Sequence, residues 1–162
     1  MRSPREFPEF RDWFGESKIV ERDGTPKIAY HGTVRDFTAF EHKKARRRAF
    51  GFHFGSLTQA EWFAQCYGPE PPTTGSNMRP VYLRITKPLR MPDVFVRGGR
   101  ESADKVVEWL IINGVVAKPE GARAVGARSI RELHERVVQL IEAAGYDGIV
   151  YENEHEIGRA HV

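Results

Sequence analysis

Apolar residues recur every three or four positions in several segments of the chain, and each segment ends at a glycine. This spacing is typical of amphipathic helices, and glycine often follows a helix C-terminus. Two segments begin with a capping-box pattern, Ser56 with Gln59 and Ser129 with Glu132. The sequence therefore predicts helices over 7–14, from Leu57 to Gly68, from Ser102 to Gly114 and from Ser129 to Gly145. In the last helix, the residues expected to face inward are Ile130, Leu133, Val137, Leu140, Ile141 and Ala144.

Shorter runs of β-branched, aromatic or alternating residues predict strands between these helices. Ser17–Val20 and Lys27–His31 flank the turn dipeptide Asp23-Gly24, so we expect them to form a hairpin. Further strands are expected over 51–54, over 81–85, where Lys87-Pro88 ends the strand, and over 148–151. The proline- and glycine-rich stretches 69–80 and 118–127 are expected to be loops. This mixture of elements predicts the α+β class.

Composition narrows the class of protein further. A chain of 162 residues with 40% hydrophobic and 29% charged residues fits one soluble domain. No apolar run approaches the roughly 20 residues that cross a bilayer, and the N-terminus lacks the apolar centre of a signal peptide. We therefore expect a cytoplasmic protein without a membrane partner. The single cysteine excludes an internal disulfide and a cysteine-cluster zinc site.

The net charge of +3 is unevenly distributed along the chain. The run HKKARRR, residues 42–48, concentrates lysine and arginine. Such a run either contacts a polyanion, such as nucleic acid or the phosphates of a small ligand, or forms a solvated loop.

A histidine ends the predicted strand Lys27–His31 and is followed by Gly32 and Thr33. Imidazole can form hydrogen bonds through both ring nitrogens, and a glycine leaves the neighbouring backbone N–H and C=O open to a flat polar ligand. The pattern therefore indicates an edge that recognises an amide. The alternative is a core histidine whose neighbours satisfy its ring.

A second histidine, His53, lies between Phe52 and Phe54 just before a predicted helix that carries Trp62 and Phe63. Aromatic side chains beside polar strand ends can hold a planar heterocycle by stacking. We expect His31 and His53 to line one cleft, with Trp62 or Phe63 near its wall. Phe52 and Phe54 are equally well explained as core residues.

Four motifs in this order carry a resemblance: YHGT, GFHFGS, Ala60-Glu-Trp-Phe-Ala64 and GYDGIVYENE. Together they resemble the ADP-ribosyltransferase superfamily, especially the domains found in phage and mobile-element polyvalent proteins. The resemblance implies a split β-sheet core with flanking helices, with residues 1–162 as a single domain. It implies NAD as co-substrate without a metal, and transfer of ADP-ribose to a protein or nucleic-acid acceptor with release of nicotinamide.

The resemblance also implies roles for individual residues. His31 matches the histidine that bonds a ribose of NAD, and Gly32 matches the glycine whose backbone binds the nicotinamide amide. His53 stands where the family has a tyrosine that stacks on nicotinamide, and Phe63 or Trp62 matches the second stacking aromatic. The catalytic candidates are His31, His53 and Glu154, and the cofactor-binding candidates are Tyr30, Gly32, Thr33, Phe54, Ser56, Ala60, Trp62 and Phe63.

The third motif of the family is an acidic or amide residue near a last strand, and no apolar-rich stretch of that kind follows Tyr151. Either the domain is cut before that strand or the acid comes from elsewhere. Glu152, Glu154 and Glu156 alternate and would share one face if the strand continued past Tyr151. Glu154 is then the candidate that stabilises the cation formed as nicotinamide leaves, and a solvated acidic tail is the alternative.

Two other classes of function fit the same residues. A binding module of the same fold, without catalysis, would use the basic run to bind nucleotide or nucleic-acid phosphates. A metal-dependent hydrolase would use His31, His53 and a tail carboxylate as ligands.

Overall fold

The structure is a computed structural model that describes residues 4–34, 36–40, 50–66, 77–94, 99–153 and 156–161. The helices are η1 (Pro4–Glu6), α1 (Pro8–Phe14), α2 (Leu57–Cys66), α3 (Arg100–Ile112), α4 (Lys118–Val125) and α5 (Ile130–Ala143). The strands are β1 (Ile28–Thr33), β2 (His53–Phe54), β3 (Asn77–Tyr82), β4 (Pro88–Pro92), β5 (Gly148–Asn153) and β6 (Glu156–His161). This mixture confirms the predicted α+β class.

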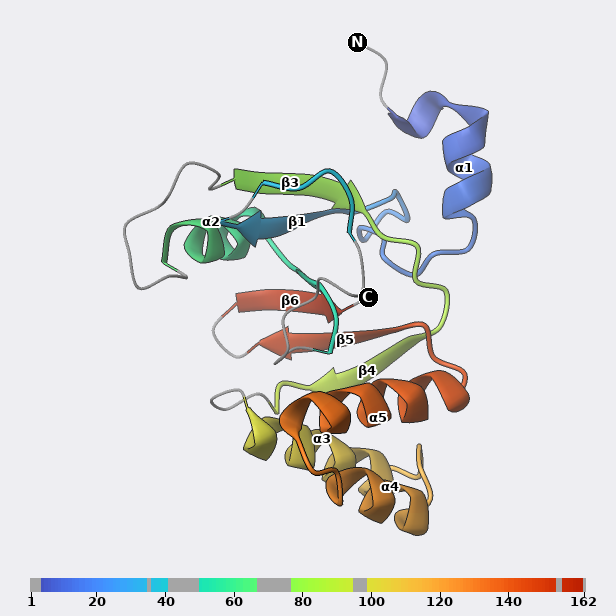
Figure 1. The fold of residues 1–162 in the computed structure, drawn as a ribbon. Helices are drawn as coiled ribbons and strands as arrows, with labels where there is room; N and C mark the ends of the chain where they lie inside the picture. The colour runs from blue at the N-terminus through green and yellow to red at the C-terminus, as the bar shows by residue number, and fades with distance from the viewer. Residues whose placement is uncertain are drawn as a thin grey trace.

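The strands form two sheets, a pair β1–β3 and a four-stranded sheet in the order β2-β6-β5-β4. β1 and β3 are antiparallel, and in the larger sheet only β4 and β5 run parallel. Tyr30 of β1 and Gly55, just after β2, exchange two backbone hydrogen bonds of 2.9 Å, which link the two sheets. In Figure 1 the pair and α2 lie above the larger sheet, and α3–α5 lie below it.

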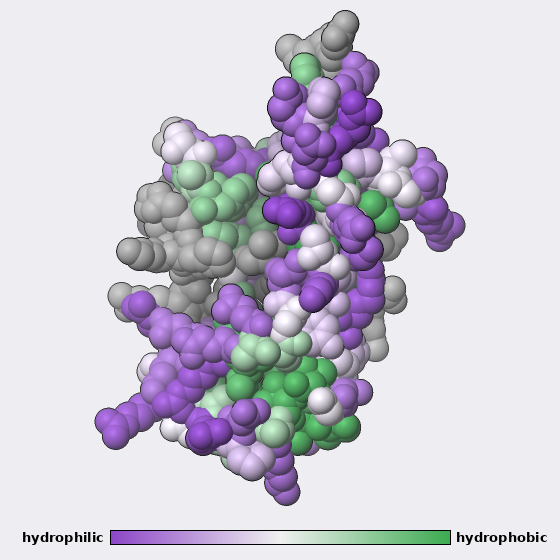
Figure 2. Space-filling model, turned by 90° about the vertical axis from the view of Figure 1, so that its right-hand side faces the viewer, coloured by the Kyte–Doolittle hydropathy of each residue, from purple (hydrophilic) through white to green (hydrophobic). Residues whose placement is uncertain are grey.

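Two hydrophobic cores correspond to these layers. One joins α3, α4 and α5 to β4 and β5, and its most buried residues include Leu110, Leu133 and Tyr151. The other lies around the two sheets and consists of Ile19, Ala29, Phe54, Leu83 and Ile85, with Phe40, Phe52, Val81 and Val150 packed against it. On the helical half a hydrophobic area also reaches the surface (Figure 2). Ile112, at the end of α3, is 74% exposed.

Local sequence signals predicted several helices well. The segment 7–14 forms α1, and Gly15 caps it with a positive φ of 49°. Both capping boxes form: the Gln59 backbone N–H donates to Ser56 Oγ at 3.2 Å, and the Glu132 N–H donates to Ser129 Oγ at 3.1 Å. In α5, Leu133, Val137 and Ile141 are buried as predicted, whereas Ala144, the residue after the helix, is exposed.

The prediction of a loop over 118–127 is wrong, because residues 118–125 form α4. Pro119 lies in the first turn, where its missing N–H has no helical partner to lose. Gly121 lies where α4 packs closely on α3: a Cβ atom there would lie 2.5 Å from Ile111 Cδ1. Gly121 therefore allows close packing of the two helices, although a glycine in the sequence is usually a sign of a loop.

The predicted strand boundaries and pairings need correction as well. The strand expected over 81–85 is β3, residues 77–82, and Pro88 begins β4 instead of ending a strand. A first strand residue needs no ladder N–H, so proline is tolerated there. The expected hairpin is reduced to an isolated bridge between Val20 and Pro26, and β1 pairs with β3.

The chain also forms a strand that the sequence analysis did not predict after GIVY. β6, residues 156–161, lies between β2 and β5 and is antiparallel to both. Glu152 and Glu156 therefore belong to different strands, with Asn153 paired to Glu156, and the expectation of one continuous strand face is wrong. None of the helices in the described part of the chain is long and apolar enough to cross a membrane.

Asp147 fixes the start of both parallel strands. Its carboxylate accepts hydrogen bonds from the Thr86 N–H and hydroxyl at 2.7 Å and from the Lys87 N–H at 2.8 Å. Burial raises the pKa of this carboxyl, but the hydrogen bonds from Thr86 and Lys87 outweigh it and hold the pKa below its usual value. The charged form of Asp147 is therefore favoured in the folded protein.

We expect Asp147→Asn to lower the free energy of unfolding by about 1–2 kcal/mol at pH 7, a value discounted for solvent exposure. A carboxyl with a depressed folded pKa stabilises the fold above its unfolded pKa, and this contribution is lost as the pH falls through the folded pKa. Urea unfolding at pH 7 and pH 3 should therefore show a gap between wild type and variant that closes in acid. Glu108→Gln, an exposed change on α3, is the control. A gap that persists unchanged at pH 3 would contradict the electrostatic account.

Candidate functional site

His31 lies in a cluster of phenylalanine rings on one face of β1. Its imidazole contacts the rings of Phe37, Phe40, Phe52 and Phe54, at centroid distances of 5.8, 5.2, 5.9 and 5.6 Å. These contacts have edge-to-face or tilted geometry, which suits the quadrupoles of the rings. The cluster therefore fixes the plane and position of the His31 ring.

The His31 ring also contacts the backbone of β2. His31 Nδ1 lies 2.8 Å from the carbonyl oxygen of His53. Because a carbonyl oxygen only accepts hydrogen bonds, Nδ1 carries the proton in this contact. His31 thus ties the end of β1 to β2, and the tautomer of its ring is set by the backbone.

His53 contacts the His31 ring through its backbone carbonyl. Phe52 and Phe54 both contact the His31 ring, and side chains alternate between the two faces of a strand. The side chain of His53 consequently lies on the opposite face of β2. The structure thus brings the two residues together but does not place both imidazoles in one cleft.

Gly32 packs directly against the backbone of α2. A Cβ atom at this position would lie 1.8 Å from the carbonyl oxygen of Ala60, far closer than any real contact. Ala60 and Ala64 are buried on the same side of α2. The face of β1 that carries Gly32 is therefore covered by α2, and the His31 cluster lies on the other face.

The N–H and C=O of Gly32 point along the sheet toward the edge of β1 that β3 does not occupy. Backbone groups alternate sides along an antiparallel strand, and those of Tyr30 face Gly55. The groups of Gly32, two residues on, face the same edge. Pro80, which has no N–H, lies opposite Tyr30, as this pattern requires. Among the described residues neither group of Gly32 forms a backbone hydrogen bond outside the strand ladder.

The other predicted binding residues lie around this edge in different roles. Thr33 ends β1 opposite Asn77, and Tyr30 is half-buried on the face toward α2. The Ser56 hydroxyl caps α2, and the backbone N–H of Ser56 donates to Gln59 Oε1 at 2.9 Å. Phe54 is buried beneath His31.

Trp62 and Phe63 lie on α2, on the opposite side of β1 from the His31 ring. Their rings contact each other at 5.0 Å, and Trp62 is half exposed. Among ring contacts between described residues, neither is paired with His31. The expected wall of one cleft is therefore divided between two faces of the β1–β3 pair.

Sequence reasoning missed a cation beside His31. Arg79 of β3 is paired with His31 across the strands, and its guanidinium lies 4.4 Å from the centre of the Phe37 ring. Its Nη2 donates to Asp36 Oδ1 at 2.6 Å. The position follows from strand register, which local sequence patterns do not contain.

Other predictions fall on residues outside those that the structure describes. These are Glu154 and the basic run 42–48. Within the described part of the chain, no group of three or more histidine, cysteine, aspartate or glutamate residues is placed to hold a metal ion.

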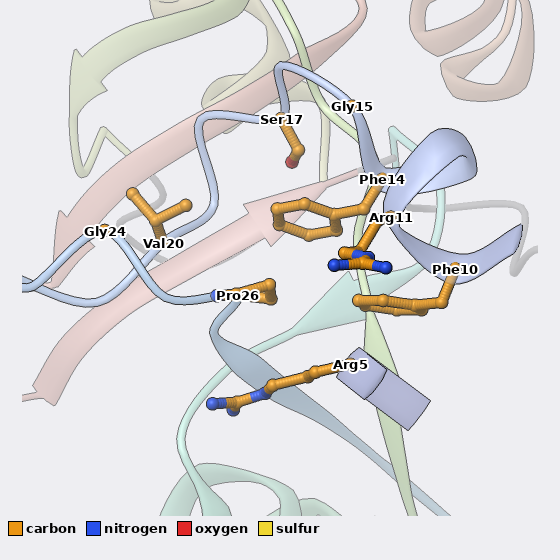
Figure 3. Close-up of a pocket in the computed structure, with 9 residues that line it drawn as sticks. All are labelled: Arg5, Phe10, Arg11, Phe14, Gly15, Ser17, Val20, Gly24 and Pro26. Carbon is orange, nitrogen blue, oxygen red and sulfur yellow. The ribbon is translucent and has the colours of Figure 1, made fainter. Parts of the chain in front are cut away.

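A hollow of about 340 Å³ lies away from the His31 cluster. It is formed by η1, α1 and the segment that follows, and Figure 3 shows the side chains of Arg5, Phe10 and Arg11 at its wall. None of the predicted site residues lines it. Arg5 is held there by its Nε, which donates to the Tyr82 hydroxyl at 3.1 Å.

The family is shown by a comparison with protein-family models. The model described as ADP-ribosyltransferase in polyvalent proteins matches residues 21–162. The chain therefore belongs to this family, and the resemblance of its motifs is confirmed. The match includes both sheets and α2–α5 and leaves out η1 and α1. The searches of curated proteins and of solved structures found no match.

Proposed function

We propose that this domain is an NAD-dependent ADP-ribosyltransferase that transfers ADP-ribose to a protein or nucleic acid and releases nicotinamide. The observation that carries the proposal is the edge of β1 at Gly32. One N–H and one C=O face outward together there, the complement of the C=O and NH₂ of a carboxamide. Membership of the ADP-ribosyltransferase family supports nicotinamide as the ligand of this edge, because nicotinamide carries such a carboxamide.

His31 and Thr33 flank Gly32 on β1, so they are the residues we assign to the ribose attached to nicotinamide. The ordered imidazole supports this assignment, since the phenylalanine rings and the His53 carbonyl hold it without needing a ligand. We also propose that the two sheets form the split core of the superfamily, within a single cytoplasmic domain.

In the proposed reaction the bond between nicotinamide nitrogen and ribose C1′ breaks, and nicotinamide leaves with the electron pair. The ribose becomes a cation stabilised by a nearby carboxylate, for which we propose Glu154. An oxygen or nitrogen of the acceptor then bonds to C1′ and loses its proton. The contribution of the protein is to hold NAD in a reactive geometry.

Nicotinamide release from NAD, followed by chromatography, tests the proposal. We expect Glu154→Gln to reduce the rate about a hundredfold or more, because it removes the charge that stabilises the cation. Glu152→Gln is the matched control and should retain most of the activity. NAD should also raise the melting temperature of both variants, since a ligand that binds only the folded state stabilises it.

The outcomes separate the classes of function. Stabilisation by NAD without nicotinamide release would favour a binding module of the same fold. If both variants lost activity equally, or if both kept the wild-type rate of nicotinamide release, Glu154 would have no specific role in the mechanism. Neither stabilisation nor turnover would overturn the proposed function.

A further inference from the structure

Arg79 places a cation beside the proposed ribose site. It is directly opposite His31 in the β1–β3 register, and the two side chains share one face of the strand pair. Phe37 contacts both, with its ring 5.8 Å from the His31 ring and 4.4 Å from the guanidinium carbon. The cation–π contact with Phe37 and the ion pair with Asp36 hold the guanidinium beside His31.

Asp36, the partner of Arg79, accepts a hydrogen bond from only one of the nitrogens of the guanidinium. Nη2 donates to one oxygen of Asp36, while the adjacent Nε is buried and has no hydrogen-bond partner among the residues that the structure describes. An arginine fork can donate through two nitrogens to two oxygens of a carboxylate or phosphate. The Asp36 side chain is 82% exposed, and ion pairs in such surroundings are weak. An anion with better-placed oxygens can therefore replace the Asp36 carboxylate.

We infer that Arg79 binds the diphosphate of the dinucleotide substrate, taking a phosphate in place of the Asp36 carboxylate. This inference rests on the proposed function, because NAD carries a diphosphate next to the ribose that we assign to His31. In this arrangement Asp36 competes with the substrate for Arg79. Arg79 sets the preference for a ligand with phosphates over nicotinamide alone.

Titration calorimetry with NAD, ADP-ribose and nicotinamide tests this role. We expect Arg79→Gln to weaken the binding of NAD and ADP-ribose about 10-fold to 100-fold, the range typical for loss of a charged hydrogen bond. Nicotinamide, which has no phosphate, should bind with unchanged affinity. Asp36→Asn should strengthen NAD binding by up to about fivefold, since it removes a weak competitor.

Two further variants make the test specific. Arg84→Gln removes an exposed arginine from the segment between β3 and β4 and should leave all three affinities unchanged. Arg79→Lys keeps the charge without the fork and should give an intermediate affinity for NAD. Melting temperatures of all variants, measured without ligand, show whether each is folded.

Unchanged NAD affinity in folded Arg79→Gln, or an equal loss of nicotinamide affinity, would overturn the role of Arg79. Either result would leave the proposed function intact if the wild type still releases nicotinamide. A wild type that binds neither NAD nor ADP-ribose would instead overturn both proposals.

Discussion

Replacing Gly32 by alanine is expected to destabilise the fold by about 3 kcal/mol or more, or to prevent folding altogether. The added Cβ would lie 1.8 Å from the Ala60 carbonyl oxygen and 2.6 Å from its carbon. Both atoms belong to the backbone of α2, so no side-chain rotation can relieve the overlap. Relief requires α2 to move away from β1, which would expose Ala60 and Ala64, buried in the present packing.

Urea unfolding measures this effect, and Gly126→Ala provides the matched control. Gly126 has a φ of −68°, and a Cβ there would meet its nearest atom at an ordinary 3.5 Å. That variant should lie within about 1 kcal/mol of wild type, with slight stabilisation expected from the less flexible unfolded chain. Similar free energies of unfolding for the two variants would contradict the close contact between β1 and α2 at Gly32.

Local signals explain how much of this fold the sequence could predict. Capping boxes at Ser56 and Ser129 depend on residues three positions apart, so the sequence alone defines where α2 and α5 begin. Glycine and proline gave misleading signals where tertiary packing decides their role. Gly121 allows α4 to approach α3, and Pro88 occupies the first position of β4. Both roles depend on distant partners.

The candidate site was predictable in its residues and not in its arrangement. The histidine, glycine and aromatic residues of the motifs do converge around β1, because the motifs lie on β1, β2 and α2. Which face each side chain occupies depends on strand register, and a local pattern does not specify it. Alternation along the strand directs the His53 side chain away from the His31 ring. Arg79 was overlooked although it is directly opposite His31.

His31→Phe is expected to lower the rate of nicotinamide release about a hundredfold or more while the protein stays folded. Phenylalanine keeps a ring among Phe37, Phe40, Phe52 and Phe54, so the aromatic packing is retained. It removes the Nδ1–H that donates to the His53 carbonyl, at a cost of about 1–3 kcal/mol. It also removes the ring nitrogens through which residue 31 can bond a ribose hydroxyl.

Two comparisons separate chemistry from packing. His31→Ala should lose activity and a further 2 kcal/mol or so, because it leaves a cavity among the rings. His134, a buried histidine in α5 whose ring lies 4.6 Å from that of Phe50, is the matched control. Folded His134→Phe should release nicotinamide at the wild-type rate, since the residue packs against Phe50 of the core formed with α3–α5 and not against the core around the proposed site. If His31→Phe kept full activity, His31 would be a packing residue only, and the ribose would have to be bound by other groups on β1.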